Sequence, residues 1–586
     1  MRNICTFILA LFIVSCSSDM KTSQNNPDQQ DLAFENYKTN FIEALWESSP
    51  GWATYVGYEK YDTVLSIPNE SNRMEEIAFL ASYLDSLKSY DPALLSPSNR
   101  TDYHLIKNQL EKSSWRIEKF KEYQWNPSSY NVAGGFAKIL GNKKINLEEK
   151  ARRIQARMRN VPAYYESAIQ NIENPTIEHT ELAIEQGRGT INYFNTIIRD
   201  SLNQAKIGIH ELQSYEASLN ISIAAIQNYI NYLEKDLLPK LKASNSRNFR
   251  IGKKLFEEKF AFEIHSAYTA EEIYKKALKR KAELNDEMIK LSKELWPKYF
   301  KDKKQPENEQ AIVKMLIDEI AKNHVHRDSF ISAIEQQIPE LETFIREKNI
   351  VYLDPSKPLV VRKTPEYMAG VAGASISSPG PYDVDGDTYY NVTPLTNYNE
   401  KQAESYLREY NHYILQVLNI HEAIPGHYLQ LVYSNQSKSM IKSILGNGAM
   451  IEGWAVYTER MMLEEGYGNF EPELWLMYNK WHLRVVCNTI LDYSIHVLDF
   501  TQDQALNLLM NEAFQEETEA RGKWKRATLS QVQLCSYFTG YTEIYDFREE
   551  LKKKKANNFN LKQFHEQFLS YGSAPVKYVR ELMLVE

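Results

Sequence analysis

Two histidines and a glutamate able to bind and use a metal lie close together in the last third of the chain. His421 and Glu422 open the segment HEAIPGH, which ends at His427. Zinc binds imidazole nitrogens and keeps a position open for water, and a carboxylate beside it can take a proton from that water. These residue types predict metal-assisted hydrolysis, with the two histidines as zinc ligands and Glu422 as general base.

The spacing of the two histidines differs from that of the common H-E-x-x-H motif, which puts them four residues apart on one helical face. His421 and His427 are six residues apart, and in a regular helix they would point roughly 240° away from each other. Pro425 removes a helical hydrogen-bond donor, and Gly426 tolerates unusual backbone conformations. We therefore expect the helix to bulge or break between the histidines.

A second acidic segment, EGWAVYTE, follows in a run with helical character. Its two carboxylates, Glu452 and Glu459, are seven residues apart and so share one helix face. One can ligate zinc while the other supports a ligand from behind. A solvent-facing pair is the alternative, but apolar neighbours such as Trp454 favour burial, and a buried acid needs a partner.

These segments also carry a family resemblance. HEAIPGHYLQ and EGWAVYTE resemble the hallmark segments of the bacterial family catalogued as domain of unknown function 885, and WATYVGYEKYD, LDYSIH and QLCSYFTG extend the resemblance over most of the mature chain. The family implies a helical, gluzincin-like zinc metallopeptidase. EGWAVYTE is also similar to the third-ligand segment of zinc aminopeptidases, which implies that Glu452 completes the zinc site and that Glu459 supports it. Tyr428, where relatives often have a second histidine, and the leucine of QLCSYFTG, where they more commonly have alanine, depart from the family pattern without touching a proposed ligand.

Two further residues are candidates for stabilising an oxyanion. Zinc peptidases of this broad type often place a tyrosine or histidine donor opposite the metal, and Tyr537 and His496 occupy two of the similar segments. Asp492, four residues before His496, is placed to hold that imidazole. The alternative is that both are packing residues, because the chain has 38 tyrosines.

The elements that position these residues are predicted to be helices. With 22 Gly and 21 Pro in 586 residues, repeated tight turns are disfavoured, and residues 33–350 and 401–586 show helical periodicity. Residues 351–400 combine Gly, Pro and β-formers, which indicates an irregular or β insert. We expect a mainly α, two-lobed, metallopeptidase-like fold with a central cleft, in which residues 401–586 are the catalytic region. The strand-like stretch from Ala374 to Tyr390 is a candidate for pairing with a peptide substrate.

The N-terminus has the features of a bacterial lipoprotein. Residues 1–15 combine Arg2 with a short apolar stretch, too brief to span a membrane, and Cys16 follows a small residue as in a lipidation site. An ordinary signal peptide is the alternative. Residues 16–32 are predicted to form a flexible tether. Ser17 instead of aspartate favours the outer membrane, with the protein facing the periplasm and touching the membrane only through its lipid.

Composition and missing motifs exclude other classes. The formal charge of −8, from 69 Lys and Arg against 77 Asp and Glu, argues against a nucleic-acid partner. The chain has no G-x-S-x-G or P-loop motif, and Cys487 and Cys535 allow at most one disulfide in the folded body. A zinc peptidase acting on peptides is the preferred hypothesis. The alternative is a non-catalytic peptide- or metal-binding lipoprotein with a relic site, but a relic could lose Glu422 freely.

Overall fold

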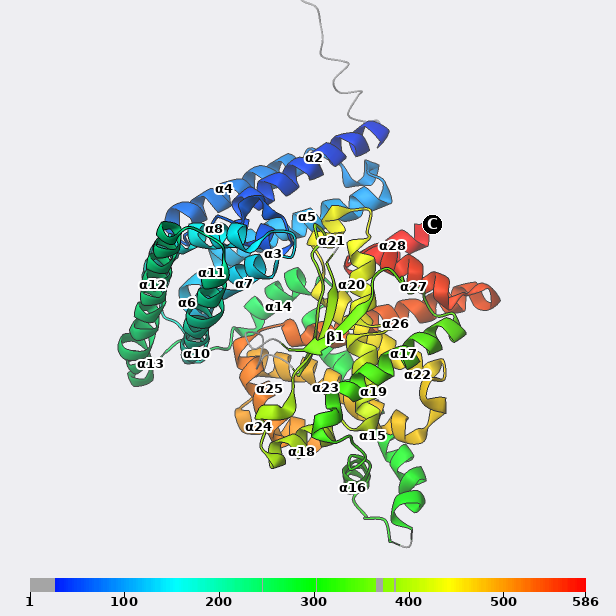
Figure 1. Cartoon of the computed structure of the whole chain (residues 1–586). Coiled ribbons are helices and arrows are strands. Elements are labelled where there is room, and N and C mark those ends of the chain that lie inside the picture. Colours follow the sequence, from blue (N-terminus) through cyan, green and yellow to red (C-terminus); the bar gives the residue numbers. More distant parts are fainter. Residues whose placement is uncertain (1–26, 245, 302, 365–372, 384–385, 586) are drawn as a thin grey trace, which may run out of the picture.

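Helices dominate the structure, a computed structural model that describes residues 27–244, 246–301, 303–364, 373–383 and 386–585 (Figure 1). One small sheet accompanies them, which confirms the mainly α-helical fold with a small β insert. The predicted signal peptide and Cys16 lie outside the described residues. The first described helix begins at Pro27, where proline's fixed φ suits a first turn. Residues 27–32 of the predicted tether are therefore helical.

The first helices form a layer over the rest of the molecule (Figure 1). Several begin at a proline or behind a capping side chain: Ser96 accepts from the backbone N–H of Asn99, and Asn69 from that of Asn72. The layer comprises α2 (Pro27–Ser48), α3 (Pro50–Tyr55), α4 (Glu70–Leu87) and α5 (Pro97–Trp115), while α6 (Glu122–Trp125), which follows them in the chain, lies lower in Figure 1 and outside the layer.

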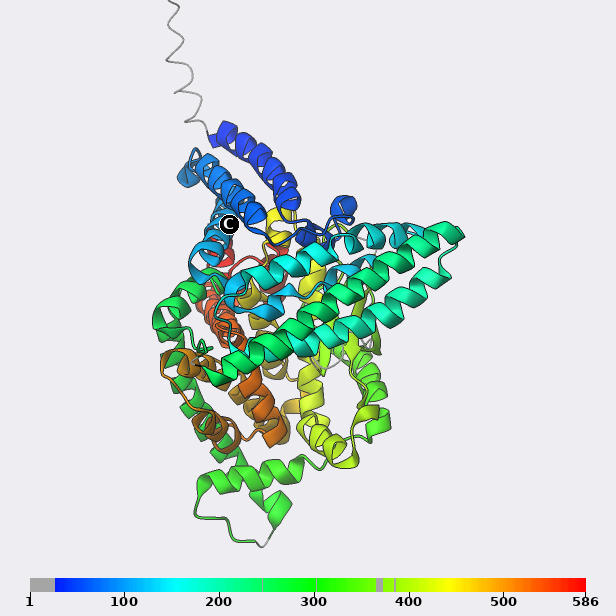
Figure 2. The same ribbon diagram turned by 90° about the vertical axis from the view of Figure 1, so that its left-hand side faces the viewer.

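A separate hydrophobic core holds the next group of helices together. Its buried residues run from Tyr130 to Leu233 and include Ile226 and Ile230, which share one face of a helix. The group forms a layer of long helices (Figure 2) and comprises α7 (Ala133–Gly141), α8 (Leu147–Met158), α9 (Val161–Asn171), α10 (Ile177–Tyr193), α11 (Arg199–Gln204), α12 (Ile209–Asn231) and α13 (Leu238–Ala243).

The main core joins the remaining helices to the first layer, with buried residues from Phe34 to Met583. Its members are α14 (Gly252–Glu263), α15 (Ala270–Phe300), α16 (Glu309–Ile320), α17 (Phe330–Lys348), α18 (Glu400–Glu409), α19 (His412–Glu422), α20 (His427–Asn435), α21 (Met440–Ile444), α22 (Gly448–Glu464), α23 (Pro472–Val497), α24 (Gln502–Asn507), α25 (Glu517–Leu529), α26 (Ser536–Lys555), α27 (Leu561–Ser570) and α28 (Val576–Val585). Cys487 and Cys535 are both buried in it as free thiols.

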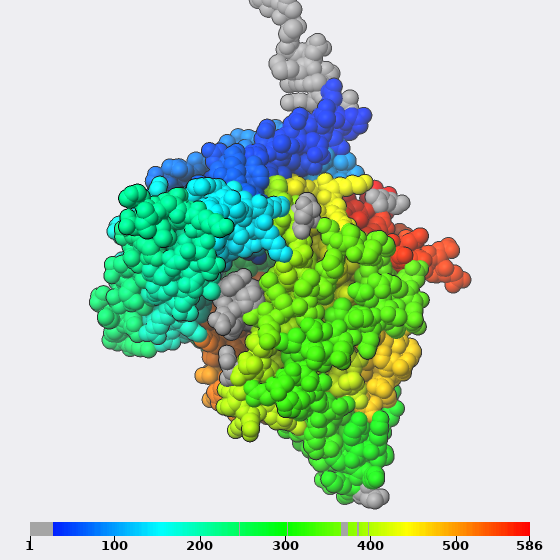
Figure 3. Space-filling view, in the orientation of Figure 1, coloured from blue at the N-terminus to red at the C-terminus, as the bar shows by residue number. Residues whose placement is uncertain are grey.

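The two cores divide the chain differently from the predicted boundaries. Helices α14 to α17 belong to the main core, with α15 packed along α23 and α17 against α19, although all four lie in the predicted N-terminal region. Periodicity identifies the buried face of a helix but not the helix that covers it. The surface is hollowed between the helices of the separate core formed by residues 130–233, coloured teal, and the green part of the body (Figure 3).

The sheet has three strands, β1 (Leu359–Lys363), β2 (Ala374–Ser377) and β3 (Thr388–Val392). Their order is β1-β3-β2, with β3 parallel to β1 and antiparallel to β2. The stretch from Ala374 to Tyr390 therefore contains an edge strand and the start of the central strand, not one strand. The sheet lies against α19, because β2 contacts this helix and the Tyr390 hydroxyl donates to Asn419 Oδ1 at 2.8 Å.

Candidate metal centre

The two histidines are brought together by the predicted break in the helix. Helix α19, capped by Asn411, ends at Glu422, and α20 begins at His427 after a turn with a cis Ile424–Pro425 peptide bond. The His421 and His427 rings then lie 4.7 Å apart, centroid to centroid, and nearly perpendicular at 88°. The break in the helix therefore brings the two imidazoles together, although the histidines are six residues apart.

Gly426 is required in this turn because of space. Its φ of −74° is combined with a ψ of −129°, which lies outside the helical and extended regions, so the backbone conformation is unusual, as expected from the sequence. A Cβ atom at this position would lie 1.9 Å from the carbonyl oxygen of His421. The turn is also tied to α22, since the Trp454 indole donates to the carbonyl of Pro425 at 2.8 Å.

Glu452, on the first turns of α22, completes a triad with the two histidines. Its Oε2 lies 3.3 Å from His427 Nε2 and 3.9 Å from His421 Nε2. The three ligand atoms are all within 4.8 Å of one another, and within the described ranges no other His, Cys, Asp and Glu side chains form such a group. Ligands about 2.0–2.2 Å from a tetrahedral zinc ion are separated by roughly 3.3–3.6 Å, so the spacing suits a shared ion.

The donor chemistry also fits zinc. Two imidazoles and one carboxylate are a three-ligand set found at catalytic zinc sites. His421 uses Nδ1 to reach Glu459, which leaves Nε2 directed at the triad. The Nδ1 atom of His427 is buried and has no hydrogen-bond partner among the described residues.

Glu459 supports the triad from behind. Its carboxylate is fully buried, and Oε1 accepts hydrogen bonds from His421 Nδ1 at 2.6 Å and from the Trp481 indole at 3.0 Å. Burial opposes protonation of His421, but the hydrogen bond to Glu459 and the charges of Glu459, Glu422 and Glu452 outweigh it and raise the histidine pKa to about 9. The Trp481 indole fixes the carboxylate, which in turn fixes the imidazole.

Glu422 lies beside the triad without belonging to it. It is the last residue of α19 and follows His421 directly. Burial raises the pKa of its carboxyl, while the charges of His427 and His421 oppose the rise. A raised pKa suits a carboxylate that must accept a proton near neutral pH.

The packing of α26 along α22 places Tyr537 within electrostatic reach of Glu452. The two helices touch at glycines: a Cβ on Gly453 would lie 2.3 Å from the Cα of Gly540. Burial raises the pKa of the Tyr537 phenol, and the charge of Glu452 adds to the rise. The phenol therefore keeps its proton and can donate it in a hydrogen bond.

His496 and Asp492 have other partners. The Asp492 carboxylate accepts the backbone N–H groups of Val532 at 3.2 Å and Leu534 at 3.0 Å. His496 Nε2 lies 2.9 Å from the Ala527 carbonyl but 3.7 Å from Asp492 Oδ1. Burial lowers the pKa of His496 to about 4, so it is a neutral core side chain. None of these partners is a triad residue, and we leave His496 out of the proposed chemistry.

Three contacts at this centre carry no sequence signal. Trp481 is one of many apolar residues on α23, and Arg526, which donates to the Tyr537 hydroxyl, lies in a charged run that resembles a solvated helix face. The meeting of Gly453 and Gly540 joins segments almost ninety residues apart and becomes visible only in the packed helices.

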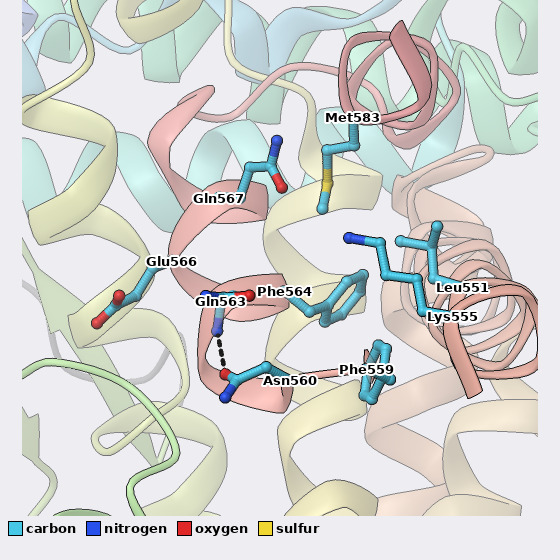
Figure 4. Close-up of a pocket in the computed structure, with 9 residues that line it drawn as sticks. All are labelled: Leu551, Lys555, Phe559, Asn560, Gln563, Phe564, Glu566, Gln567 and Met583. Atoms are coloured by element: carbon cyan, nitrogen blue, oxygen red, sulfur yellow. Dashed lines mark hydrogen bonds between the residues drawn. The ribbon is translucent and has the colours of Figure 1, made fainter. Parts of the chain in front are cut away.

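Two surface cavities lie away from the triad. One of about 320 Å³ is formed by the end of α26 with α27 and α28, where Asn560 caps the first turn of α27 and Phe559, Phe564 and Met583 supply apolar walls (Figure 4). None of its lining residues belongs to the triad. We therefore assign no role in the metal centre to this cavity.

Together, the fold and the site define an α-helical protein with a His-His-Glu triad able to hold a metal. The family described as "Bacterial protein of unknown function (DUF885)" matches residues 50–583. The chain belongs to this family. A comparison with curated proteins gives no match.

Two solved structures are similar over nearly the whole chain. "A putative lipoprotein of unknown function" from Shewanella oneidensis is 54% identical, with a TM-score of 0.85, 94% of this chain covered and 99% of that one. A "putative lipoprotein" from Colwellia psychrerythraea shares the fold at 16% identity, with a TM-score of 0.77 and coverage of 94% and 98%. No helix in the described parts of the chain is long and apolar enough to cross a membrane.

Proposed function

We propose that the chain is a zinc-dependent hydrolase that cleaves peptide bonds. The observation that carries the proposal is the intact base: Glu422 stands beside a complete three-ligand set, and the set is supported by Glu459. His421, His427 and Glu452 would hold the metal. The chemistry that zinc supplies when bound is Lewis acidity, which polarises a carbonyl and lowers the pKa of a water molecule.

The chain's own residues would carry the proton and the developing charge. The Glu422 carboxylate would accept the proton of the attacking water and pass it to the leaving amine. The Tyr537 hydroxyl would donate a hydrogen bond to the oxygen of the scissile carbonyl as its negative charge grows. Glu459 and Trp481 would keep the His421 ring fixed throughout.

The sheet offers a place for the peptide backbone. Strand β2 pairs with β3 on one side, and in the described residues its other edge carries no strand. Because β2 contacts α19, which ends at Glu422, a peptide added to this edge would pass close to the triad. We propose an extended peptide as the substrate and no nucleic-acid partner, in keeping with the net charge of −8.

We also propose that the protein is anchored to the bacterial cell envelope by lipid on Cys16, at the outer membrane facing the periplasm. The residues around Cys16 support lipidation, and the similar Shewanella oneidensis protein is described as a "putative lipoprotein". Ser17, which follows Cys16 in place of an aspartate, supports a location at the outer membrane. The membrane contact would be made by the lipid alone.

A non-catalytic peptide- or metal-binding lipoprotein is the second candidate, and one experiment separates the two. Metal content of the purified protein is measured first, and a mixture of peptides is then incubated with the protein, with and without a chelator. A peptidase holds one zinc per chain and releases chelator-sensitive fragments detectable by mass spectrometry. Bound metal without any cleavage would favour the binding protein.

A further inference from the structure

An arginine with unused hydrogen-bonding capacity stands beside the candidate metal centre. Arg526, exposed on the last turn of α25, donates through Nη2 to Gln533 Oε1 at 2.7 Å and to the Tyr537 hydroxyl at 3.2 Å. Both partners are neutral. The other three of its five N–H groups make no hydrogen bond within the described residues, and no carboxylate there lies within 4.0 Å of it. Arg521, on the same helix, is by contrast paired with Glu517.

Tyr537 connects Arg526 to the neighbourhood of the triad. Its hydroxyl accepts a hydrogen bond from Arg526 at 3.2 Å. Tyr537 also lies on α26 one turn before Gly540, which meets Gly453, the residue after Glu452. A group bound to Arg526 would therefore lie on the Tyr537 side of the candidate metal centre.

The cations near Arg526 are already paired or held toward the neutral form by burial. On α23, Lys480 pairs with Glu409 and Arg484 with Glu519. Lys523, one turn before Arg526 on α25, is 5% exposed, and burial lowers the pKa of its ammonium well below the ordinary value. Arg526 is therefore the exposed cation of this group that pairs with no carboxylate among the described residues.

We propose that Arg526 binds a carboxylate of the peptide substrate and so selects peptides that present one near the scissile bond. This inference rests on the peptidase function proposed above. A guanidinium with several unused donors matches the planar, two-oxygen shape of a carboxylate. Two groups of a peptide offer this chemistry, the free C-terminus and the side chain of Asp or Glu.

Three synthetic peptides distinguish these sources: an apolar sequence with a free C-terminal acid, the same sequence as C-terminal amide, and the amide with one Glu introduced. Each is incubated with zinc-loaded wild-type protein and with the Arg526→Gln, Arg526→Lys and Arg521→Gln variants. We expect kcat/KM for the free acid to exceed that for the amide by about 10- to 100-fold, mostly through KM. In Arg526→Gln this ratio should fall to about one, Arg526→Lys should restore part of it, and Arg521→Gln should keep it. A Glu-containing amide cleaved as well as the free acid would identify the side chain as the source.

A binding measurement separates this inference from the proposed activity. Calorimetric titration of the same peptides into zinc-loaded Glu422→Gln protein, with and without Arg526→Gln, needs no turnover. The carboxylate-bearing peptide should bind about 10- to 100-fold more tightly than the plain amide, and Arg526→Gln should abolish the difference. Equal affinities would overturn the inference, even if peptides are cleaved. Failure of the wild type to cleave any peptide would overturn the peptidase, while the titration would still decide the role of Arg526.

Discussion

Gly453 and Gly540 meet where α22 crosses α26, so closely that a Cβ on Gly540 would lie 2.8 Å from the Cα of Gly453. Gly453 follows the proposed ligand Glu452, and Gly540 lies one helical turn after Tyr537. The contact therefore sets the separation between the proposed metal ligand and the proposed oxyanion donor. A larger residue at either position would push the two helices apart.

Gly540→Ala should lower the free energy of unfolding by about 1–3 kcal/mol, because the added methyl meets the backbone of α22, including the Ala449 carbonyl oxygen at 1.7 Å. Urea unfolding followed by tryptophan fluorescence measures the change. Gly522→Ala on α25 is the control, since a Cβ there meets nothing within 4 Å and alanine favours the helix. Equal stabilities of the two variants would show that the helices can separate without cost.

Glu452→Gln should lose tightly bound zinc, because two histidines leave the protein one ligand short of the three usual at catalytic zinc. Zinc per chain, determined by atomic emission after dialysis, should be near one for the wild type and near zero for the variant. Glu465→Gln, at the end of the same helix, should keep its zinc. Full zinc occupancy in Glu452→Gln would mean that another carboxylate is the ligand.

Glu459→Gln should weaken zinc binding by about 10- to 100-fold without abolishing it. The amide can still accept from the Trp481 indole, but the negative charge that makes the His421 imidazole a better donor to the metal is gone. Competition with a chromophoric chelator gives the affinity. An unchanged affinity would remove Glu459 from the metal site.

Stability should fall in mild acid through His565, which is fully buried behind α22 between the Ile350 carbonyl and the Tyr457 hydroxyl. Burial lowers its pKa to about 3, so the unfolded chain, with an ordinary histidine pKa near 6.5, takes up the proton first. The contribution of His565 to stability is complete above pH ~6.5 and is lost as the pH falls toward 3, by up to about 1.4 kcal/mol per pH unit.

The test compares His565→Gln with the wild type. The difference in unfolding free energy should shrink by about 2 kcal/mol between pH 7.5 and pH 5, because glutamine does not titrate. A difference that stays constant between these two pH values would show that this histidine is not held neutral by the fold.

The sequence predicted best those features that depend on residues close together in the chain. The spacing of His421 and His427, with Pro425 and Gly426 between them, predicted a broken helix, and the structure confirms it. The helical pattern likewise predicted the fold class. Glu452 and Glu459 were assigned from their seven-residue spacing and the family resemblance, and the geometry is compatible with both assignments.

What the sequence did not predict depends on helices that meet only in the folded chain. His496 lies in a segment similar to the family, yet its ring faces the Ala527 carbonyl, because α23 presents it to the end of α25. The contribution of Trp481 comes from its position opposite Glu459 on a different helix. The helices also divide between two hydrophobic cores, one of which contains residues 130–233. This division depends on which amphipathic helices pack against each other, which the sequence pattern does not reveal.

Replacing Glu422 by glutamine tests the central claim most directly, because the substitution keeps size and hydrogen bonding while removing the proton acceptor. Zinc content and hydrolysis of a cleaved peptide are measured on the same purified sample. We predict one zinc per chain, an unchanged melting temperature and a rate lowered by about 10²- to 10⁴-fold. Hydrolysis at the wild-type rate with zinc bound would contradict the assignment of Glu422 as the base, and loss of zinc would contradict the proposed ligand set.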